Sequence, residues 1–213
     1  MKTFAFTMGA ALAICCPAAG AIVNGDFSAG NTGFLTEYTF VVFNGTEGEY
    51  TVRSDPQNWN NAFAPTPDHT SGDGPMLVVN GATAGNPYFW QQTIAVLPGS
   101  DYGFSAWVSS AVADGPAELL VEINGAMAGP SFQAPVVTGT WERLSRIWNS
   151  AANNMATIRL INSNLSVYPN DFYVDDISFV AVPEPSTLAI IASLALMMIC
   201  QRRASTRLRK NQR

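Results

Sequence analysis

The sequence predicts an all-β protein, a jelly-roll β-sandwich of about ten strands, with an N-terminal signal peptide and one C-terminal transmembrane helix. Three observations lead to this fold class. Short strand-like runs alternate with clusters of Gly, Pro, Asn and Asp between residues 22 and 180, no stretch there has sustained helical periodicity, and apolar segments stand at both ends of the 213-residue chain. The expected division is a signal peptide at 1–21, a sandwich domain at 22–181 and a tail at 182–213.

The N-terminal segment has the form of a secretory signal peptide. Lys2 precedes an apolar run at 4–16, and small residues ending in Ala21 follow Pro17. This order predicts export and cleavage by signal peptidase after Ala21. An uncleaved membrane anchor is the alternative, which the shortness of the run and its small-residue end disfavour.

The C-terminal segment combines a short motif, an apolar run and a basic end. The motif is Val182-Pro183-Glu184-Pro185, the stretch 188–200 carries no charge, and six Lys or Arg residues lie in 202–213. Because basic residues beside a span stay on the cytoplasmic side, we expect a transmembrane helix at about 186–201, a basic tail inside and the domain outside. A buried globular helix is the alternative, since a comfortable span needs about 20 residues.

These three parts, in this order and spacing, resemble the PEP-CTERM sorting signal of Gram-negative envelope proteins. The resemblance covers residues 182–213 and implies recognition by an exosortase, a membrane cysteine transpeptidase, near Pro183, Glu184 and Pro185. It also implies a precursor anchored in the inner membrane, which is then delivered to the cell envelope or to an extracellular matrix rich in polysaccharide.

Alternation assigns the faces of the expected strands. Tyr102, Phe104, Ala106 and Val108 share the predicted core side of one strand, which leaves Trp107 on the opposite side with Ser105 and Ser109. In the last strand, Asp175 shares the predicted core side with Tyr173, Ile177 and Phe179. A buried carboxylate is costly unless it is paired or bound to a metal. The strands are expected at 21–27, 35–43, 49–53, 76–80, 88–96, 102–109, 117–123, 140–148, 155–161 and 172–180.

The charge of the domain excludes one class of partner and favours another. Between Ile22 and Val182 the sequence has fifteen acidic residues, four arginines and no lysine. Such a domain repels phosphate backbones, so nucleic acid is not an expected partner. It favours cations such as Ca²⁺, which takes oxygen ligands. All three cysteines lie in the terminal apolar segments, so the domain has no disulfide.

The middle of the chain resembles the galactose-binding-like jelly rolls that include many carbohydrate-binding modules. The resemblance rests on the segments 24–27, 68–72 leading into 76–81, and 174–179. It implies a structural Ca²⁺ site formed by the Asp26 carbonyl, Ser28, Asp68 or the adjoining 71–73 loop, and Asp175. The chain departs from the family at Ser28, where a Glu is common. In the alternative, Asp175 caps backbone amides, and Asp26 and Asp68 are turn residues.

Catalytic signatures are weak. His69 is the only histidine, no nucleophile motif accompanies it, and zinc would have too few ligands. Glu118 and Glu122 lie on one face of one strand, and at the ordinary rise per residue their α-carbons are about 13 Å apart. The two catalytic carboxyls of a glycosidase lie about 5–10 Å apart and usually come from different elements. The two glutamates are expected on a solvated strand face. The sequence therefore predicts a protein without enzymatic activity.

Tryptophan is the residue type best suited to stacking on sugar rings. Trp90 and Trp141 are expected in the core, whereas Trp59 lies in a polar loop and Trp107 on a non-core face, so these two are the candidate ligand-binding residues. We therefore expect an exported, non-catalytic protein that binds extracellular polysaccharide. The alternatives are a structural matrix protein without a defined ligand and a secreted glycosidase.

Overall fold

The computed structural model describes residues 20–43, 45–114 and 116–182. The expected signal peptide up to residue 19, residues Pro183 to Pro185 of the sorting motif, the helix expected at about 186–201 and the basic tail lie outside these residues. The chain divides into two compact units at Val180–Ala181, and of the second unit only Ala181 and Val182 are described. No helix in the described part is long and apolar enough to cross a membrane.

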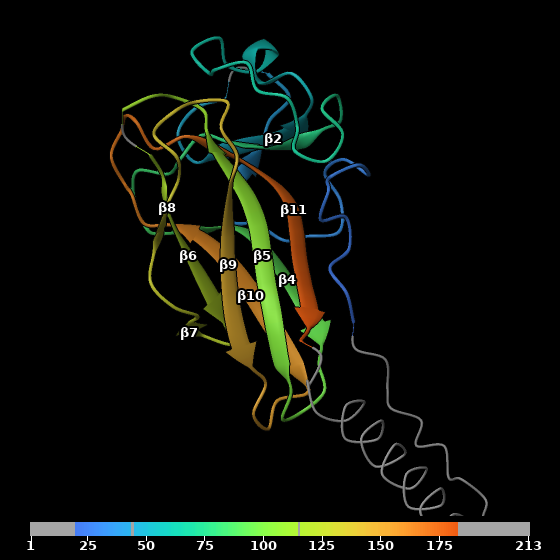
Figure 1. Ribbon diagram of the computed structural model, residues 1–213. Coiled ribbons are helices and arrows are strands. Elements are labelled where there is room, and N and C mark those ends of the chain that lie inside the picture. Colours follow the sequence, from blue (N-terminus) through green and yellow to red (C-terminus); the bar gives the residue numbers. More distant parts are fainter. Residues whose placement is uncertain (1–19, 44, 115, 183–213) are drawn as a thin grey trace, which may run out of the picture. The chain divides into compact units, whose positions relative to one another are not determined.

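The first unit is a sandwich of two β-sheets, as predicted. One sheet has the strand order β1-β2-β3-β11-β5-β9, and the other has the order β4-β10-β6-β7, with β8 paired to β6. Figure 1 shows the sheets as two layers, with β11, β5 and β9 in front of β4, β10 and β6. The strands are β1 Thr39–Phe40, β2 Glu49–Arg53, β3 Met76–Val79, β4 Tyr88–Ala95, β5 Asp101–Ser110, β6 Glu118–Ile123, β7 Ala126–Met127, β8 Phe132–Gln133, β9 Glu142–Asn149, β10 Met155–Asn162 and β11 Phe172–Ala181.

Eight of the ten expected strands are present within two residues at each end. The segment 21–27 is not a strand, because Asn24 and Phe27 adopt positive φ values of 55° and 54°, and the Asn24 side chain bonds to backbone groups at 29–32 to close a turn. The segment 35–43 contributes only β1 and a bridge between Leu35 and Gln91. The two-residue strands β7 and β8 are too short for a period-2 pattern to reveal.

The alternation in β5 is confirmed. Tyr102, Phe104, Ala106 and Val108 are at most 1% exposed and belong to the main core between the sheets, while Trp107 lies on the other face. Large aromatic side chains dominate this core: the rings of Tyr102 and Phe179 are stacked at 5.0 Å. Such burial of apolar surface is the main favourable term in folding.

The face assignment in β11 was confirmed for Ile177 and Phe179 and was wrong for Tyr173 and Asp175. Phe172, Val174, Ile177 and Phe179 all pack in the main core. Val174 and Ile177 are three positions apart, whereas strict alternation would put only residues an even number of positions apart on the same face. Asp176 has φ 48°, a left-handed conformation that shifts the alternation by one residue. As a result, Asp175 lies on the outer face of the six-stranded sheet, on the same side as Tyr173, and not among the core side chains.

The long connection between β2 and β3, residues 54–75, covers part of that outer face. It begins with the 3-10 helix Pro56–Asn58, which Asp55 caps, and it forms a second hydrophobic cluster against the sheet. Trp59 is 1% exposed in this cluster, where it contacts Phe63 and donates from Nε1 to the Val41 carbonyl at 3.1 Å. The expectation that Trp59 is exposed was therefore wrong, because the polar residues around it form the surface of a folded loop with a core of its own.

Replacing Trp59 with Ala is expected to lower the free energy of unfolding by about 3–5 kcal/mol, as for other large buried aromatics. Gly45→Ala should act in the same direction, because an added Cβ would overlap the Trp59 ring. Urea unfolding of each variant measures this, with Val42→Ala as a control whose side chain is 55% exposed. A Trp59→Ala variant as stable as the control would contradict the packing described here.

Candidate functional site

The connection 54–75 is fastened to the six-stranded sheet by two neighbouring carboxylates of β11. Asp175 Oδ2 accepts from the backbone N–H groups of His69 at 2.9 Å and of Thr70 at 3.1 Å, and its Oδ1 accepts from the backbone N–H of Asp176. Asp176 bonds to His69 Nδ1 at 2.6 Å and accepts from the Thr70 hydroxyl at 2.7 Å. The first carboxylate thus caps backbone amides, and the second pairs with the only histidine of the chain.

Trp107 of β5 also contacts the connection 54–75, next to Asp175 and Asp176. The His69 ring is stacked on Trp107, with centroids 3.9 Å apart and an angle of 18°, and its edge meets Trp141 at 5.8 Å. Trp141 also donates from Nε1 to the carbonyl of Pro67. One face of the Trp107 ring is therefore covered by the protein itself, so its main contact in this structure is with the loop.

The carboxylates at the predicted Ca²⁺ site are engaged with donors of the protein in this arrangement. Asp26 Oδ1 accepts from the backbone and hydroxyl of Ser28, and Asp68 accepts from Ser71 and from the Gly74 backbone, as in turns. Asp175 is surrounded by N–H donors, which point positive charge toward its oxygens. Among the described residues, no three His, Cys, Asp or Glu side chains are grouped as a metal site would require. Calcium binding stays a prediction of the resemblance.

Burial and hydrogen bonds shift the pKa values of three carboxylates in and next to the six-stranded sheet. It raises the pKa of Asp175 to about 6, although hydrogen bonds from Asp176, Thr70 and His69 oppose the shift. Burial also raises the pKa of Asp171 to about 7, helped by the charge of Glu47. Burial alone would raise the pKa of Asp68, but hydrogen bonds from Ser71 and Gly74 hold it below its ordinary value.

A polar row that sequence reasoning missed crosses the outer face of the five-stranded sheet. Arg159 on β10 lies opposite Gln91 on β4 and Glu122 on β6 in the strand register. Its Nε donates to Gln91 Oε1 at 2.6 Å and its Nη1 donates to Glu122 Oε1 at 3.2 Å, while its guanidinium carbon lies 5.0 Å from the centre of the Tyr88 ring. The guanidinium is thus held on three sides, and the Arg159 side chain remains 40% exposed.

The next row on this face adds two hydroxyls. Thr93 and Thr157 lie opposite each other and are joined through their Oγ1 atoms at 3.0 Å. Together with the Arg159 row, the face presents a planar cation, an amide, a carboxylate and hydroxyls in fixed positions near an aromatic ring. Fixed donors and acceptors of this kind orient polar ligands such as sugars.

The two glutamates of β6 have separate partners. Glu122 is 16% exposed and paired with Arg159, whereas Glu118 accepts from the hydroxyl of Ser131. Both lie on the outer face, as expected; Glu118 is exposed, and Glu122 is partly covered by its pairing with Arg159. Their neighbours Leu119, Val121 and Ile123 pack inward in the main core.

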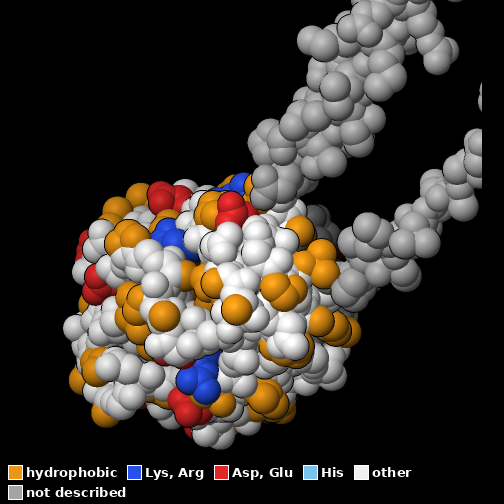
Figure 2. Space-filling model, turned by 90° about the horizontal axis from the view of Figure 1, so that it is seen from below, with side chains coloured by type: hydrophobic (Ala, Val, Ile, Leu, Met, Phe, Trp, Pro, Cys, Tyr) orange, Lys and Arg blue, Asp and Glu red, His pale blue; other side chains and the backbone are white. Residues whose placement is uncertain are grey.

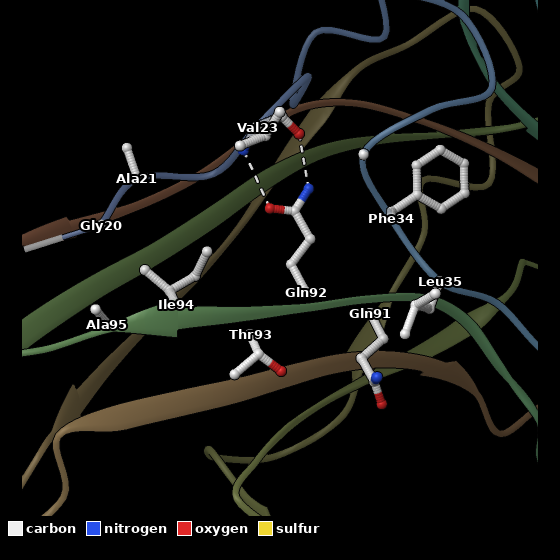
Figure 3. A pocket seen from close by; sticks show the side chains of 11 residues that line it. Gly20, Ala21, Val23, Phe34, Leu35, Gln91, Gln92, Thr93, Ile94 and Ala95 are labelled. Atoms are coloured by element: carbon white, nitrogen blue, oxygen red, sulfur yellow. Dashed lines mark hydrogen bonds between the residues drawn. The ribbon is translucent and has the colours of Figure 1, made fainter.

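A cavity of about 560 Å³ lies at the outer edge of β4, between the N-terminal segment and residues 33–35 (Figure 3). The Gln92 side chain spans part of it by donating to the Val23 carbonyl at 2.7 Å and accepting from the Val23 N–H at 3.0 Å. Because this amide is committed to the backbone and Phe34, Leu35 and Ile94 are apolar, the cavity offers few free polar groups to a sugar.

Comparison with known proteins identifies the fold. No protein-family model and no curated protein sequence matches the chain. The xylan-binding domain CBM22-1 of Xyn10C from Paenibacillus barcinonensis is 13% identical, with a TM-score of 0.52 over 80% of this chain and 99% of that one. The Stig cyclase Fisc from Fischerella sp. TAU is 12% identical, with a TM-score of 0.57 over 78% and 98%. Another Fischerella cyclase is 14% identical, with a TM-score of 0.56 over 80% and 100%. The chain shares one sandwich fold with a binding module and with enzymes.

The free energy of unfolding is expected to decrease as the pH rises from about 5 to about 8. The folded chain keeps protons on Asp171 and Asp175 in a range where the unfolded chain, with carboxyl pKa values near 3.8, has released them. The stabilising effect of these bound protons is complete below pH 3.8, the pKa of both carboxyls in the unfolded chain. It disappears as the pH rises past their pKa values in the folded chain, about 6 for Asp175 and about 7 for Asp171.

Urea midpoints of the full chain across this range test the pH dependence. Asp171→Asn should remove most of the decrease, because Asn keeps an acceptor for the Gly81 N–H but does not titrate. Asp114→Asn, an exposed substitution of equal charge change, should retain it. Equal pH slopes in the two variants would contradict the assignment.

Proposed function

We propose that this chain is an exported, non-catalytic carbohydrate-binding protein, which contacts extracellular polysaccharide through the outer face of its five-stranded sheet. One observation carries the proposal: the Arg159 guanidinium is fixed by Gln91, Glu122 and Tyr88 and still faces solvent. Groups that are already ordered lose little conformational freedom when a ligand binds, so their hydrogen bonds contribute more to affinity.

The fold by itself does not separate binding from catalysis, because a xylan-binding domain and cyclases share it to a similar degree. The side chains favour binding. A glycosidase needs one carboxyl that donates a proton and a second that acts as base or nucleophile. Glu122 is instead held by Arg159, and Glu118 by Ser131, and His69 is stacked on Trp107 and bonded to Asp176.

The surface charge agrees with a ligand that lacks phosphate. Figure 2 shows one end of the domain, where hydrophobic side chains are scattered among uncharged ones and Lys or Arg side chains are sparse. The four arginines of the domain are outnumbered by fifteen acidic residues. A neutral polysaccharide would not be repelled by such a surface.

Export and sorting are proposed from the sequence of the two ends. The resemblance of residues 182–213 to a PEP-CTERM signal supports processing by an exosortase, after signal peptidase has acted at the N-terminus. The protein would then reside in the envelope or extracellular matrix of a Gram-negative bacterium. Cell fractionation with and without residues 182–213 tests this part: an unchanged destination after removal would contradict it.

Arg159→Gln in the full chain is expected to weaken binding to a neutral oligosaccharide by about tenfold or more, because hydrogen bonds from a charged group are worth about 1.5–3 kcal/mol. A panel of xylo-, cello- and manno-oligosaccharides identifies the best ligand, and calorimetry then measures the affinity. Tyr88→Ala should weaken binding in the same direction, since the ring supports the guanidinium.

Arg53→Gln is the matched control, because it removes the same charge from β2 in the other sheet. Its affinity should equal that of the unaltered chain. If Arg159→Gln and Arg53→Gln bind equally well, the proposed face is wrong. If no glycan binds and the chain self-assembles, the structural matrix protein is the better account.

A further inference from the structure

The outer face of the six-stranded sheet has a groove of its own. It is separate from the outer face of the five-stranded sheet, which was proposed above to bind polysaccharide. It has a volume of about 330 Å³ and lies over β11, β5 and β9. This volume is at the lower end of the range of about 300–1,000 Å³ that small-ligand pockets occupy. Its lining includes small residues and the exposed side chains of Ile147 and Val180. The small residues are Gly103, Ser105, Ser145 and Ser178.

The charge of this groove is opposite to that of the domain. Arg143 lines it from the outer face of β9, and no Asp or Glu is among its lining residues. Arg146 also borders it, but Arg146 lies opposite the core-facing Phe104, so its side chain leaves β9 on the other face. The ion pairs of the described part of the chain are His69 with Asp176 and Arg159 with Glu122, so Arg143 is not neutralised by a carboxylate there. On β11, Asp176 precedes Ser178 by two residues, but its carboxylate is taken by His69 and Thr70.

The two arginines differ in how much of the guanidinium is free. Arg146 donates to the carbonyls of Ser145 and Pro130 on the other face of β9, so its guanidinium is tied to the backbone and is not offered to the groove. Arg143 is exposed and makes one hydrogen bond to protein, from Nη2 to Ser105 Oγ at 3.2 Å. Its remaining donors form the planar fork that pairs bidentately with a carboxylate.

We propose that this groove binds a carboxylate-bearing sugar, such as a uronic acid residue of an acidic polysaccharide. Arg143 would pair with the sugar carboxylate, and the hydroxyls of Ser105, Ser145 and Ser178 would bond to the ring hydroxyls. Because the domain as a whole repels polyanions, the attraction is local, and salt should weaken it. The chain then has two separate glycan-binding faces of different charge preference.

The test uses two forms of one oligomer, oligogalacturonate and the same oligomer with its carboxylates methyl-esterified. Calorimetry of the full chain should show binding of the free acid and at least about tenfold weaker binding of the ester, because esterification removes the charged acceptor. Arg143→Gln should reduce the affinity for the acid by a similar factor, and Arg143→Lys should restore part of it. Equal affinities for acid and ester would overturn the proposal.

Two further variants distinguish binding in the groove from a general attraction of the acid to positive charge. Ser178→Leu leaves the charge unchanged but fills the groove, so it should abolish binding of the acid. Arg53→Gln removes a positive charge elsewhere and should have no effect. If Arg53→Gln weakens binding as much as Arg143→Gln, the groove is not the site.

The outcome is independent of the function proposed above. Arg159→Gln should leave oligogalacturonate binding intact, and Arg143→Gln should leave neutral oligosaccharide binding intact. Loss of both ligands in either variant would show one shared site and contradict the assignment of two faces.

Discussion

The two sheets are held together by aromatic and branched aliphatic side chains that project from alternate positions of each strand into one core. Tyr102 and Phe179 stack there across neighbouring strands, and Phe89 meets Phe172 across the sheets with centroids 4.8 Å apart. Since most inward positions of the strands are committed to this core, the outward positions are those available for binding. The two faces with organised polar groups are made of such positions, Arg159 and Gln91 on one sheet, and Arg143 and Ser178 on the other.

The sequence predicted the class of fold because period-2 alternation and turn residues are local signals. In β5, four alternating residues were enough to identify the core side. The β11 assignment failed because one residue, Asp176, adopts a left-handed conformation and shifts the alternation. Nothing in the segment 172–180 indicates that bulge, since Asp is only one of several residues that tolerate positive φ. The prediction of a strand at 21–27 failed for a related reason, because the Asn24 side chain bonds to nearby backbone groups and closes a turn.

The candidate sites were harder to predict, because each depends on contacts between distant segments. Trp59 is surrounded in sequence by Asn and Gln, yet the loop folds back so that its ring reaches the sheet. Trp107 was assigned to the correct face, but its stacking partner His69 comes from another part of the chain. The Arg159 row joins residues from three strands, and only the register brings Gln91, Arg159 and Glu122 into line. Alternation could have marked each as outward, but not as neighbours.

The central claim is that the outer face of the five-stranded sheet contacts a neutral glycan. Nuclear magnetic resonance of the ¹⁵N-labelled chain during titration with its best neutral oligosaccharide tests it most directly, because each backbone and guanidinium signal reports its own surroundings. The account predicts that the largest shifts fall on Arg159 Nε and on the amides around Gln91, Thr157 and Glu122. Shifts confined to the 54–75 connection or to the edge of β4 would contradict it.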